Sequence, residues 1–183
     1  SIFLEQERNR SEKLLHNIIP KSIADQLKKD SKLISMDNPE ISVLFADIVS
    51  FTVMSEKTSS EKIVGFLNDM FSKFDDLTES YGVEKIKTIG DSYMVVAGMP
   101  VARKDHALIL FNLAKEMVKI SATFYDHNGN PIKLRIGLNS GPAVSGVIGK
   151  SKFAFDVWGD TINTAARLEI DGSPDCVHMT KVT

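Results

Sequence analysis

Two aspartates stand beside apolar segments, in settings where carboxylates could hold a hard cation. Asp47 closes the mainly apolar segment 41–46, and Asp91 lies in the Gly-Asp-Ser turn at 90–92. Mg²⁺ is usually bound by one or two carboxylates together with substrate phosphates. A Gly-Asp pair is also common at the tip of a β-hairpin, because Gly tolerates positive φ and Asp hydrogen-bonds nearby backbone. From the residues alone, Asp91 is therefore either a metal ligand or a turn residue.

The elements around these aspartates can be predicted from hydrophobic periodicity. Residues 83–89 and 93–97 predict the two strands of a hairpin, and apolar residues at a 3.6-residue period predict a helix over 60–81. A second long helix is expected from about Lys104 to Asp126, with His106 at its start as a capping or surface residue rather than a ligand. Ser50-Phe51-Thr52 predicts a turn into a helix, whose free N–H groups favour a phosphate near Asp47.

The second half of the chain predicts shorter strands and one more helix. The expected segments are a strand over 132–139, a turn at Ser140-Gly141-Pro142, strands over 143–148 and 153–158, a helix from 159–161 onward and a final strand over 176–180. The order of the first six elements is typical of a ferredoxin-like split βαβ fold. We therefore expect an α+β domain with an antiparallel sheet, helices on one face, and a C-terminal hairpin arm and helix.

The N-terminal region predicts a helical lead-in. Residues 1–19 predict a helix that Pro20 ends, and Ile23 and Leu27 share one face of a second, short helix. This region is either a surface helix packed on its own domain or a linker to an upstream domain. We place the lead-in at 1–38 and the catalytic domain at 39–183, with a C-terminal end that we expect to be truncated.

Composition excludes several classes of protein. The chain has 183 residues, 43% of them hydrophobic and 25% charged, with a net charge of −2, which favours one globular domain and no nucleic-acid partner. One cysteine excludes an internal disulfide framework, and with four scattered histidines a zinc site is not expected. Apolar runs are all shorter than the roughly 18 residues that a membrane-spanning helix needs.

Three segments together resemble the catalytic domain of class III nucleotidyl cyclases. They are residues 45–52 (FADIVSFT), 85–94 (KIKTIGDSYM) and 158–167 (WGDTINTAAR). Residues 14–20 (LLHNIIP) also resemble the lead-in helix of the family, which in relatives follows membrane or sensor domains. The resemblance implies a cytoplasmic domain of a membrane-tethered or sensor-linked protein.

The resemblance also implies a reaction and its machinery. A nucleoside triphosphate is cyclised to a 3′,5′-cyclic monophosphate with release of pyrophosphate, which is a phosphorus–oxygen lyase reaction. Asp47, Asp91 and the backbone carbonyl of Ile48 would hold two Mg²⁺ or Mn²⁺ ions per active site. Asn163 would orient the ribose, and Arg167 would stabilise the charge that grows on the α-phosphate.

Lys87 and Asp156 match the positions that read the purine in this family. Lys can donate to adenine N1 and Asp can accept from its 6-amino group, so we predict ATP as substrate and an adenylate cyclase. GTP is the alternative, because the sequence of residues 159–165 looks more like that of guanylyl cyclases. The family builds its sites at a head-to-tail homodimer interface, with metal aspartates from one subunit and base-reading residues, Asn and Arg from the other.

Two other functions remain as hypotheses. The chain could be a catalytically silent regulatory or dimerisation module, whereas a polymerase-like transferase would need a basic nucleic-acid surface.

The sequence departs from the family pattern in two places. The lysine that contacts the terminal phosphates in relatives would lie beyond Thr183. Pro142 stands where some relatives have an arginine. Both departures predict weak nucleotide binding.

Overall fold

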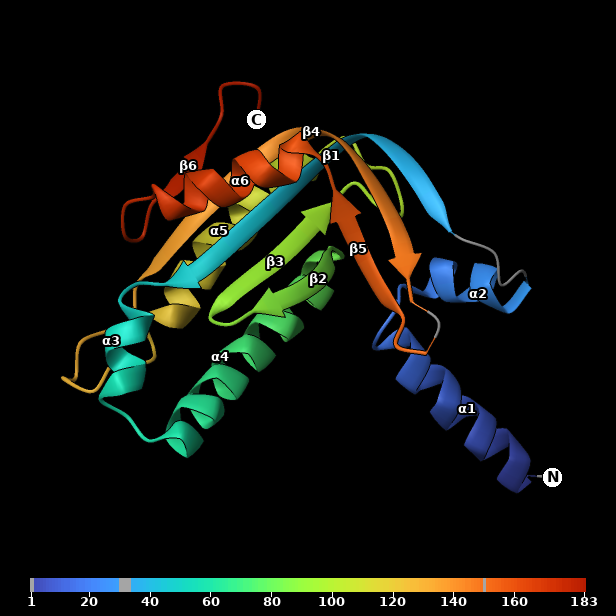
Figure 1. Cartoon of the computed structure of the whole chain (residues 1–183), viewed down its shortest axis with the longest axis horizontal. Helices are drawn as coiled ribbons and strands as arrows, with labels where there is room; N and C mark the ends of the chain where they lie inside the picture. The colour runs from blue at the N-terminus through green and yellow to red at the C-terminus, as the bar shows by residue number, and fades with distance from the viewer. Residues whose placement is uncertain (1, 30–33, 150) are drawn as a thin grey trace.

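One sheet organises the chain in this computed structural model, which describes residues 2–29, 34–149 and 151–183 (Figure 1). The strand order is β2-β3-β1-β4-β5, antiparallel throughout, and β6 adds to β4 as a parallel neighbour. The strands are β1 (Ser35–Ile48), β2 (Glu84–Ile89), β3 (Ser92–Ala97), β4 (Leu134–Ile148), β5 (Ala154–Trp158) and β6 (Val177–Met179). Asp91 occupies the tip of the β2–β3 hairpin, so the predicted hairpin is confirmed.

Helices lie on both faces of this sheet. They are α1 (Ile2–His16), α2 (Lys21–Lys29), α3 (Phe51–Glu56), α4 (Ser60–Tyr81), α5 (His106–Ser121) and α6 (Asp160–Ile170). The helix predicted over 60–81 is confirmed as α4, whereas α5 ends at Ser121, five residues before the predicted end. The α+β fold with an antiparallel sheet is confirmed, with α4 and α5 on one face and α6 on the other.

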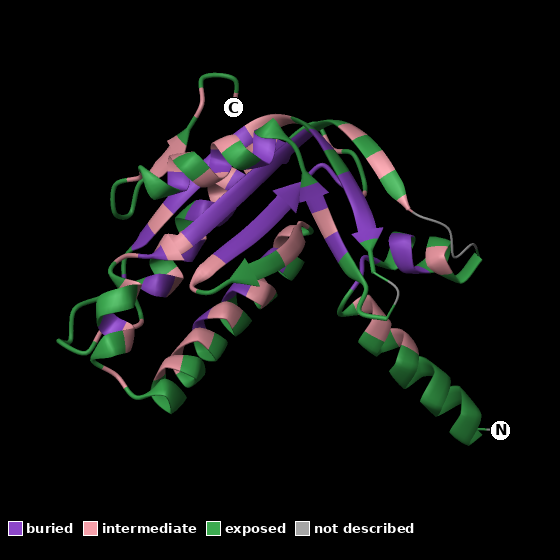
Figure 2. Ribbon diagram, viewed as in Figure 1, coloured by how far each residue is buried: buried purple, intermediate pink, exposed green. Residues whose placement is uncertain are grey.

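The sheet has a hydrophobic core on each of its faces, and the alternating directions of the side chains along β1 explain both. Leu44, Ala46 and Ile48 pack with α4 and α5, whereas Val43 and Phe45 pack with α6 on the opposite face. Successive side chains of a strand point to opposite faces, so a strand covered on both sides is apolar at every position. Figure 2 shows the resulting continuous buried band along the central strands.

The β4 strand corrects one prediction. Residues 134–148 form one strand, and the turn predicted at Ser140-Gly141-Pro142 is wrong. Ser140 and Gly141 pair with Ser42 and Ile41 of β1, and the register then shifts between Asn38 and Ile41. This bulge lies opposite Pro142, where the missing N–H of proline would otherwise leave a gap in the ladder.

The start of α5 corrects a second expectation. His106 is buried, with 7% of its surface exposed, and its Nδ1 lies 2.7 Å from the hydroxyl of Ser42. Ser42 in turn lies 2.6 Å from the hydroxyl of Ser140. His106 therefore belongs to a buried polar contact between α5 and the sheet rather than to the surface.

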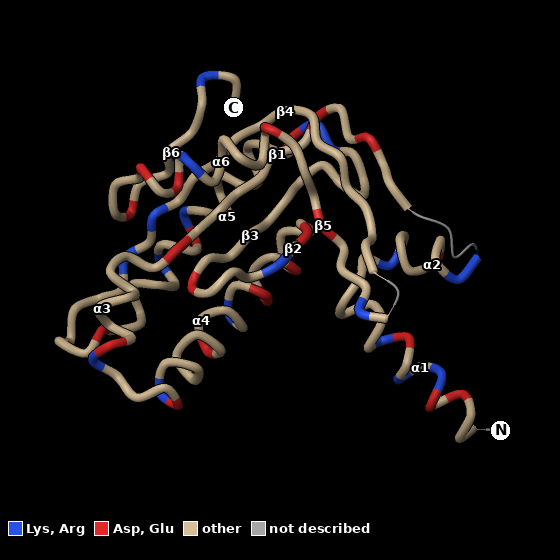
Figure 3. The backbone as a smooth tube through the Cα atoms, viewed as in Figure 1, with Lys and Arg blue, Asp and Glu red and all other residues tan. Residues whose placement is uncertain are grey.

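The lead-in lies partly against the domain. In α1 every described residue is at least partly exposed, and the helix extends away from the sheet with acidic and basic residues interspersed (Figure 3). Ile19 and Ile23, in contrast, are buried in the core on the α6 side. β1 begins at Ser35, before the boundary predicted at 38, while residues 30–33 of the predicted connector lie outside the described residues. Within the described ranges, no helix has the length and hydropathy needed to cross a bilayer.

Candidate functional site

Asp47 lies near the end of β1, directly opposite Arg135 of β4. The guanidinium of Arg135 forms a fork on this carboxylate: Nε donates to Oδ1 at 3.2 Å and Nη2 donates to Oδ2 at 3.1 Å. The Asp47 side chain is 15% exposed, so the pair is more shielded than a surface ion pair. Such bidentate, charge-assisted contacts are among the stronger polar interactions in proteins.

Asp91 reaches the same place from the hairpin tip. Its Oδ2 accepts a hydrogen bond of 3.2 Å from the backbone N–H of Ile48, the residue after Asp47. Burial raises the pKa of Asp91, the N–H groups of Asp91 and Ile48 counteract this, and the charge of Asp47 raises it further. The fold thus brings the predicted residues Asp47, Ile48 and Asp91 together.

Glu169 of α6 lies beside this pair and has no counterpart among the predicted residues. It is 6% exposed, and its Oε1 lies 3.9 Å from Nε of Arg135. Burial raises the pKa of Glu169 to about 8, and contact with Asp47 acts in the same direction. In the sequence, Arg135 is a polar residue in an alternating strand, and this pattern predicts only that its side chain points away from the apolar face. Its meeting with Asp47 and Glu169 depends on strand register, which periodicity does not reveal.

The chemistry of these groups fits a divalent cation with a preference for oxygen. Two carboxylates and the carbonyl of the residue between them are the hard ligands that Mg²⁺ takes. Burial is the main cause of the raised pKa of Asp91, and the nearby charge of Asp47 adds to it. No cluster of three or more His, Cys, Asp and Glu residues suited to a metal occurs in the described part of the chain. Water molecules or the oxygens of a bound phosphate would supply the remaining ligands of a cation here.

Lys87 and Asp156 meet across two strands that lie far apart in the sheet order. Lys87 Nζ of β2 lies 2.5 Å from Asp156 Oδ2 of β5, and Asp156 Oδ1 accepts from the N–H of Val157 at 2.8 Å. The Lys87 side chain is 42% exposed and that of Asp156 18%. The pair thus presents a donor and an acceptor together at the surface.

Asn163 and Arg167 lie four residues apart on the exposed side of α6. Arg167 makes only a long contact, 3.9 Å, with Asp160. The helix itself is fixed at its start, where the Thr161 hydroxyl donates to the carbonyl of Pro142 at 2.7 Å. Asn139 then donates to the carbonyl of Thr161 at 3.1 Å. Two exposed polar side chains are thereby held on a firmly seated helix.

Phe51 and Thr52 begin α3, as predicted from the turn after Asp47. Ser50 before them has φ 58°, a left-handed conformation that turns the chain sharply out of β1. Phe51 packs partly into the core below, whereas Thr52 is exposed. Of the two, only the Thr52 side chain is free to meet a ligand.

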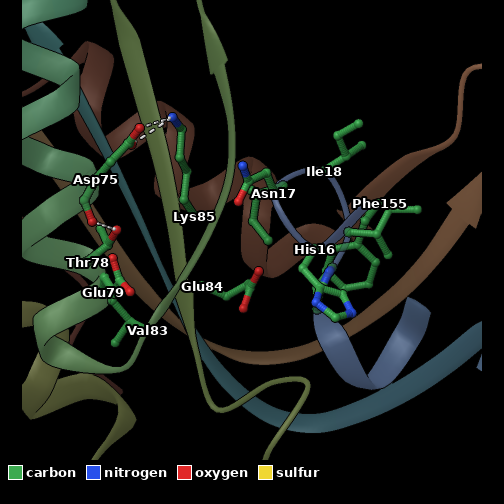
Figure 4. A pocket seen from close by; sticks show the side chains of 13 residues that line it. His16, Asn17, Ile18, Asp75, Thr78, Glu79, Val83, Glu84, Lys85 and Phe155 are labelled. Atoms are coloured by element: carbon green, nitrogen blue, oxygen red, sulfur yellow. Dashed lines mark hydrogen bonds and ion pairs between the residues drawn. The ribbon is translucent and has the colours of Figure 1, made fainter. Parts of the chain in front are cut away.

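A polar cavity of about 640 Å³ borders this region without being lined by any of these residues, although its lining includes Ile86 and Phe155, the neighbours of Lys87 and Asp156 in the sequence (Figure 4). It opens between the turn after α1, the end of α4 and the edge strand β2, and Figure 4 shows Glu84, Asn17 and His16 around it. Lys85 Nζ forms an ion pair with Asp75 on its wall, at 2.7 Å. Burial raises the pKa of Glu84 to about 7. None of the predicted site residues lines this cavity.

Comparisons with known proteins agree with the resemblance. Residues 34–183 match the family described as adenylate and guanylate cyclase catalytic domain. An adenylate cyclase of Mycobacterium tuberculosis is 48% identical over 180 residues, covering 98% of this chain and 40% of that protein. The guanylate cyclase soluble subunit beta-2 of Rattus norvegicus is 40% identical over 175 residues, covering 94% and 26% respectively.

A solved structure gives the same result. The catalytic core of a rhodopsin-guanylyl cyclase with converted specificity, in complex with ATPalphaS, superposes with a TM-score of 0.75 and 38% identity. The match covers 80% of this chain and 79% of that one. The chain spans less than half the length of the two curated relatives. On these matches, the chain belongs to the adenylate and guanylate cyclase catalytic domain family.

Proposed function

We propose that this domain converts ATP into 3′,5′-cyclic AMP and pyrophosphate. The observation that carries the proposal is the meeting of Asp47 and Asp91 around the backbone of Ile48, where Asp91 Oδ2 accepts the N–H of Ile48 at 3.2 Å. The 48% identity to an enzyme named adenylate cyclase supports the same reaction.

The reaction forms one bond and breaks another at the α-phosphorus. The ribose 3′ oxygen attacks this atom and loses its proton, while the bond to the β-phosphate oxygen breaks and pyrophosphate leaves. Asp47, Asp91 and the Ile48 carbonyl would hold two Mg²⁺ or Mn²⁺ ions, which when bound acidify the 3′-hydroxyl and neutralise the leaving group. Arg167 would face the α-phosphate and Asn163 the ribose, while the Thr52 hydroxyl and the backbone N–H groups of Phe51 and Thr52 would face the phosphate chain.

Substrate choice is assigned to Lys87 and Asp156. Their contact at 2.5 Å places one donor beside one acceptor, the pattern that adenine N1 and its 6-amino group require. Guanine presents the reverse pattern, so each polar group would face an unmatched partner, and such mismatches discriminate strongly. GTP is the second candidate, favoured by the 40% identity to a guanylate cyclase subunit.

The complete site requires a second copy of the chain. One subunit would contribute Asp47 and Asp91, and the other would contribute Lys87 with the residues on α6. The arm formed by β4 and β5 supports this arrangement: Val144 and Trp158 are paired in register and 41% and 40% exposed. Asp156, two residues from Trp158, pairs with Gly146 on the same face of the arm. An exposed apolar surface beside a recognition residue is typical of an interface.

The lead-in supports a link to another domain. An extended α1 whose described residues all stay at least partly exposed suits a connection to an upstream sensor or membrane domain in a cytoplasmic location. A silent regulatory module is the remaining alternative, and it makes an opposite prediction for the assay below.

A two-nucleotide assay tests the proposal. The chain is expected to form cyclic AMP from ATP with Mn²⁺ or Mg²⁺, and far less cyclic GMP from GTP. Asp47→Asn is expected to abolish product with an unchanged circular dichroism spectrum, because the carboxylate charge is lost but the shape is kept. Lys87→Glu is expected to lower the ratio of ATP to GTP turnover by about tenfold or more, since it replaces the donor to N1 with an acceptor.

Three outcomes would reject parts of the proposal. A folded protein without product from either nucleotide favours the silent module. Preferential cyclic GMP formation by the unmodified chain favours the guanylate cyclase. Full activity in Asp47→Asn removes the metal-ligand assignment.

A further inference from the structure

Arg135 lies between two carboxyl groups, those of Asp47 and Glu169, and donates hydrogen bonds to only the first. Both Asp47 oxygens receive a hydrogen bond from it, at 3.2 and 3.1 Å. Glu169 offers its Oε1 only 3.9 Å from the Arg135 Nε. That oxygen is buried and accepts no hydrogen bond from any residue that the structure describes. An acceptor is thus already in place next to a guanidinium that is engaged elsewhere.

The arrangement raises a conflict for metal binding. A cation on Asp47 would have to share its two oxygens with a guanidinium that already occupies both of them. Like charges at such separations repel, and the Arg135 side chain is 35% exposed, so water replaces a lost partner only in part. Arg135 therefore needs a second partner whenever Asp47 takes a different cation.

We propose that Arg135 is a positioning residue with two acceptors: it neutralises Asp47 in the metal-free domain and turns its guanidinium to the unpaired Oε1 of Glu169 when a divalent cation takes the Asp47 oxygens. The inference rests on the proposed function only for the assignment of Asp47 as a metal ligand. In the metal-free state the fork holds the Asp47 carboxylate at the mouth of the site in one orientation. In the metal-bound state Glu169 keeps the displaced guanidinium paired.

The test is a double-mutant cycle on Mn²⁺ affinity, measured on the whole chain by electron paramagnetic resonance of free Mn²⁺ without nucleotide. Arg135→Gln removes the competitor and is expected to tighten Mn²⁺ binding by about tenfold. Glu169→Gln removes the second partner and is expected to weaken binding by about tenfold, a size usual for residues behind metal ligands. The double variant is expected to bind like Arg135→Gln alone, because Glu169 acts through Arg135.

Simple electrostatics makes a different prediction. If both residues acted only through their charge, the two effects would add and the double variant would bind like the unmodified chain; this result overturns the proposal. Weaker Mn²⁺ binding in Arg135→Gln, unchanged binding in Glu169→Gln, or Mn²⁺ binding that Asp47→Asn does not reduce would also overturn it. Should Arg135→Gln fail to fold, Arg135→Met, which removes the charge and keeps a long side chain, replaces it in the cycle with the same expected results.

A matched control exists elsewhere in the chain. Arg103 forms a similar fork on Asp105, with distances of 2.7 and 2.9 Å. Arg103→Gln removes such a pair away from the site and is expected to leave Mn²⁺ affinity unchanged. Because the readout contains no nucleotide, these shifts can appear in a chain that makes no cyclic AMP. If the chain makes cyclic AMP but these shifts in Mn²⁺ affinity are absent, the inference about Arg135 is rejected and the proposed function is not.

Discussion

Among the residues that the structure describes, burial raises the pKa of three carboxyl groups, and each lies in a different environment. Asp91 is held by backbone N–H groups next to a second aspartate. Glu169 faces Asp47 and Arg135. Glu84 lies on the wall of the polar cavity, and burial alone raises its pKa. A carboxyl group that is buried without a compensating partner makes stability depend on pH.

Glu84→Gln is expected to stabilise the domain at alkaline pH. The pKa of Glu84 is about 7 in the folded state, against 4.5 ordinarily, so the folded chain keeps a proton that the unfolded chain loses between these values. The free energy of unfolding therefore falls as pH rises from about 4.5 to 7 and is flat above. Partial exposure reduces the effect, so the variant should gain about 1–2 kcal/mol at pH 8 and almost nothing near pH 4.5.

Urea denaturation at pH 4.5, 6 and 8 measures this difference. Glu79→Gln is the control, because Glu79 lines the same cavity but is exposed. A gain in Glu84→Gln that is equal at all three pH values would attribute the effect to packing rather than to the proton.

The sequence was sufficient to find the two aspartates but not their neighbours. Asp47 and Asp91 follow recognisable strand and turn signals, and their motifs point to the family. Arg135 looks like the polar half of an alternating strand, and Glu169 like one charge on an amphipathic helix. What joins them is the register of β1 against β4 and the depth at which α6 sits, and neither depends on local sequence.

At the scale of elements, the backbone of α6 lies very close to that of β4. A Cβ placed on Gly137 of β4 would lie 2.2 Å from the carbonyl of Ala165 and 2.4 Å from the N–H nitrogen of Glu169. Only glycine allows the helix backbone to approach the strand this closely. The position of α6 in turn determines where Asn163 and Arg167 are presented.

Gly137→Ala is expected to lower both stability and activity. The added methyl group must push α6 away from β4, and overpacking of this kind costs about 1–3 kcal/mol. Thermal melting should show the loss, and cyclic AMP formation should fall further than the folded fraction because the residues on α6 are displaced.

Gly65→Ala supplies the opposite case. Gly65 lies on the exposed side of α4, where a Cβ would meet no atom within 4 Å. Alanine is a better helix former there and should add up to about 1 kcal/mol. Equal stability in both variants would show that the α6 contact tolerates a methyl group.

The elements themselves were predicted unevenly, for physical reasons. The α4 helix and the β2–β3 hairpin are built from strong local patterns and match their predicted bounds closely. The β4 strand was divided wrongly because Ser140-Gly141-Pro142 is turn-like in isolation. In the fold, a bulge in β1 absorbs Pro142, so a tertiary pairing overrides the local preference.

At the scale of the whole molecule, the proposed site is divided between two surfaces of the same chain. Asp47 and Asp91 lie at the end of β1 and the hairpin tip, whereas Lys87 and Asp156 pair across β2 and β5. If one chain completed a site alone, a defect in either set would abolish activity regardless of partners. If two chains complete it, defects in different sets can compensate each other.

Mixing two inactive variants therefore tests the dimer. Asp47→Asn loses a metal ligand and Arg167→Ala loses the positive charge at the α-phosphate, so each is expected to be inactive alone. In a mixed two-fold dimer both defects fall in one site and the other site is intact. Random pairing of equal amounts makes half of the dimers mixed, so about a quarter of the unmodified activity should return.

The arm surface provides the control for this experiment. Trp158 is 40% exposed and lies opposite Val144 on the face that carries Asp156. Adding Trp158→Ser to both inactive variants should weaken association, so that restored activity falls while the melting temperature of each chain stays the same. Size-exclusion chromatography with light scattering measures the association directly. A mixture that stays inactive although light scattering detects dimers would mean that one chain supplies both the aspartates and Arg167 to each site, and the shared-site arrangement would have to be abandoned.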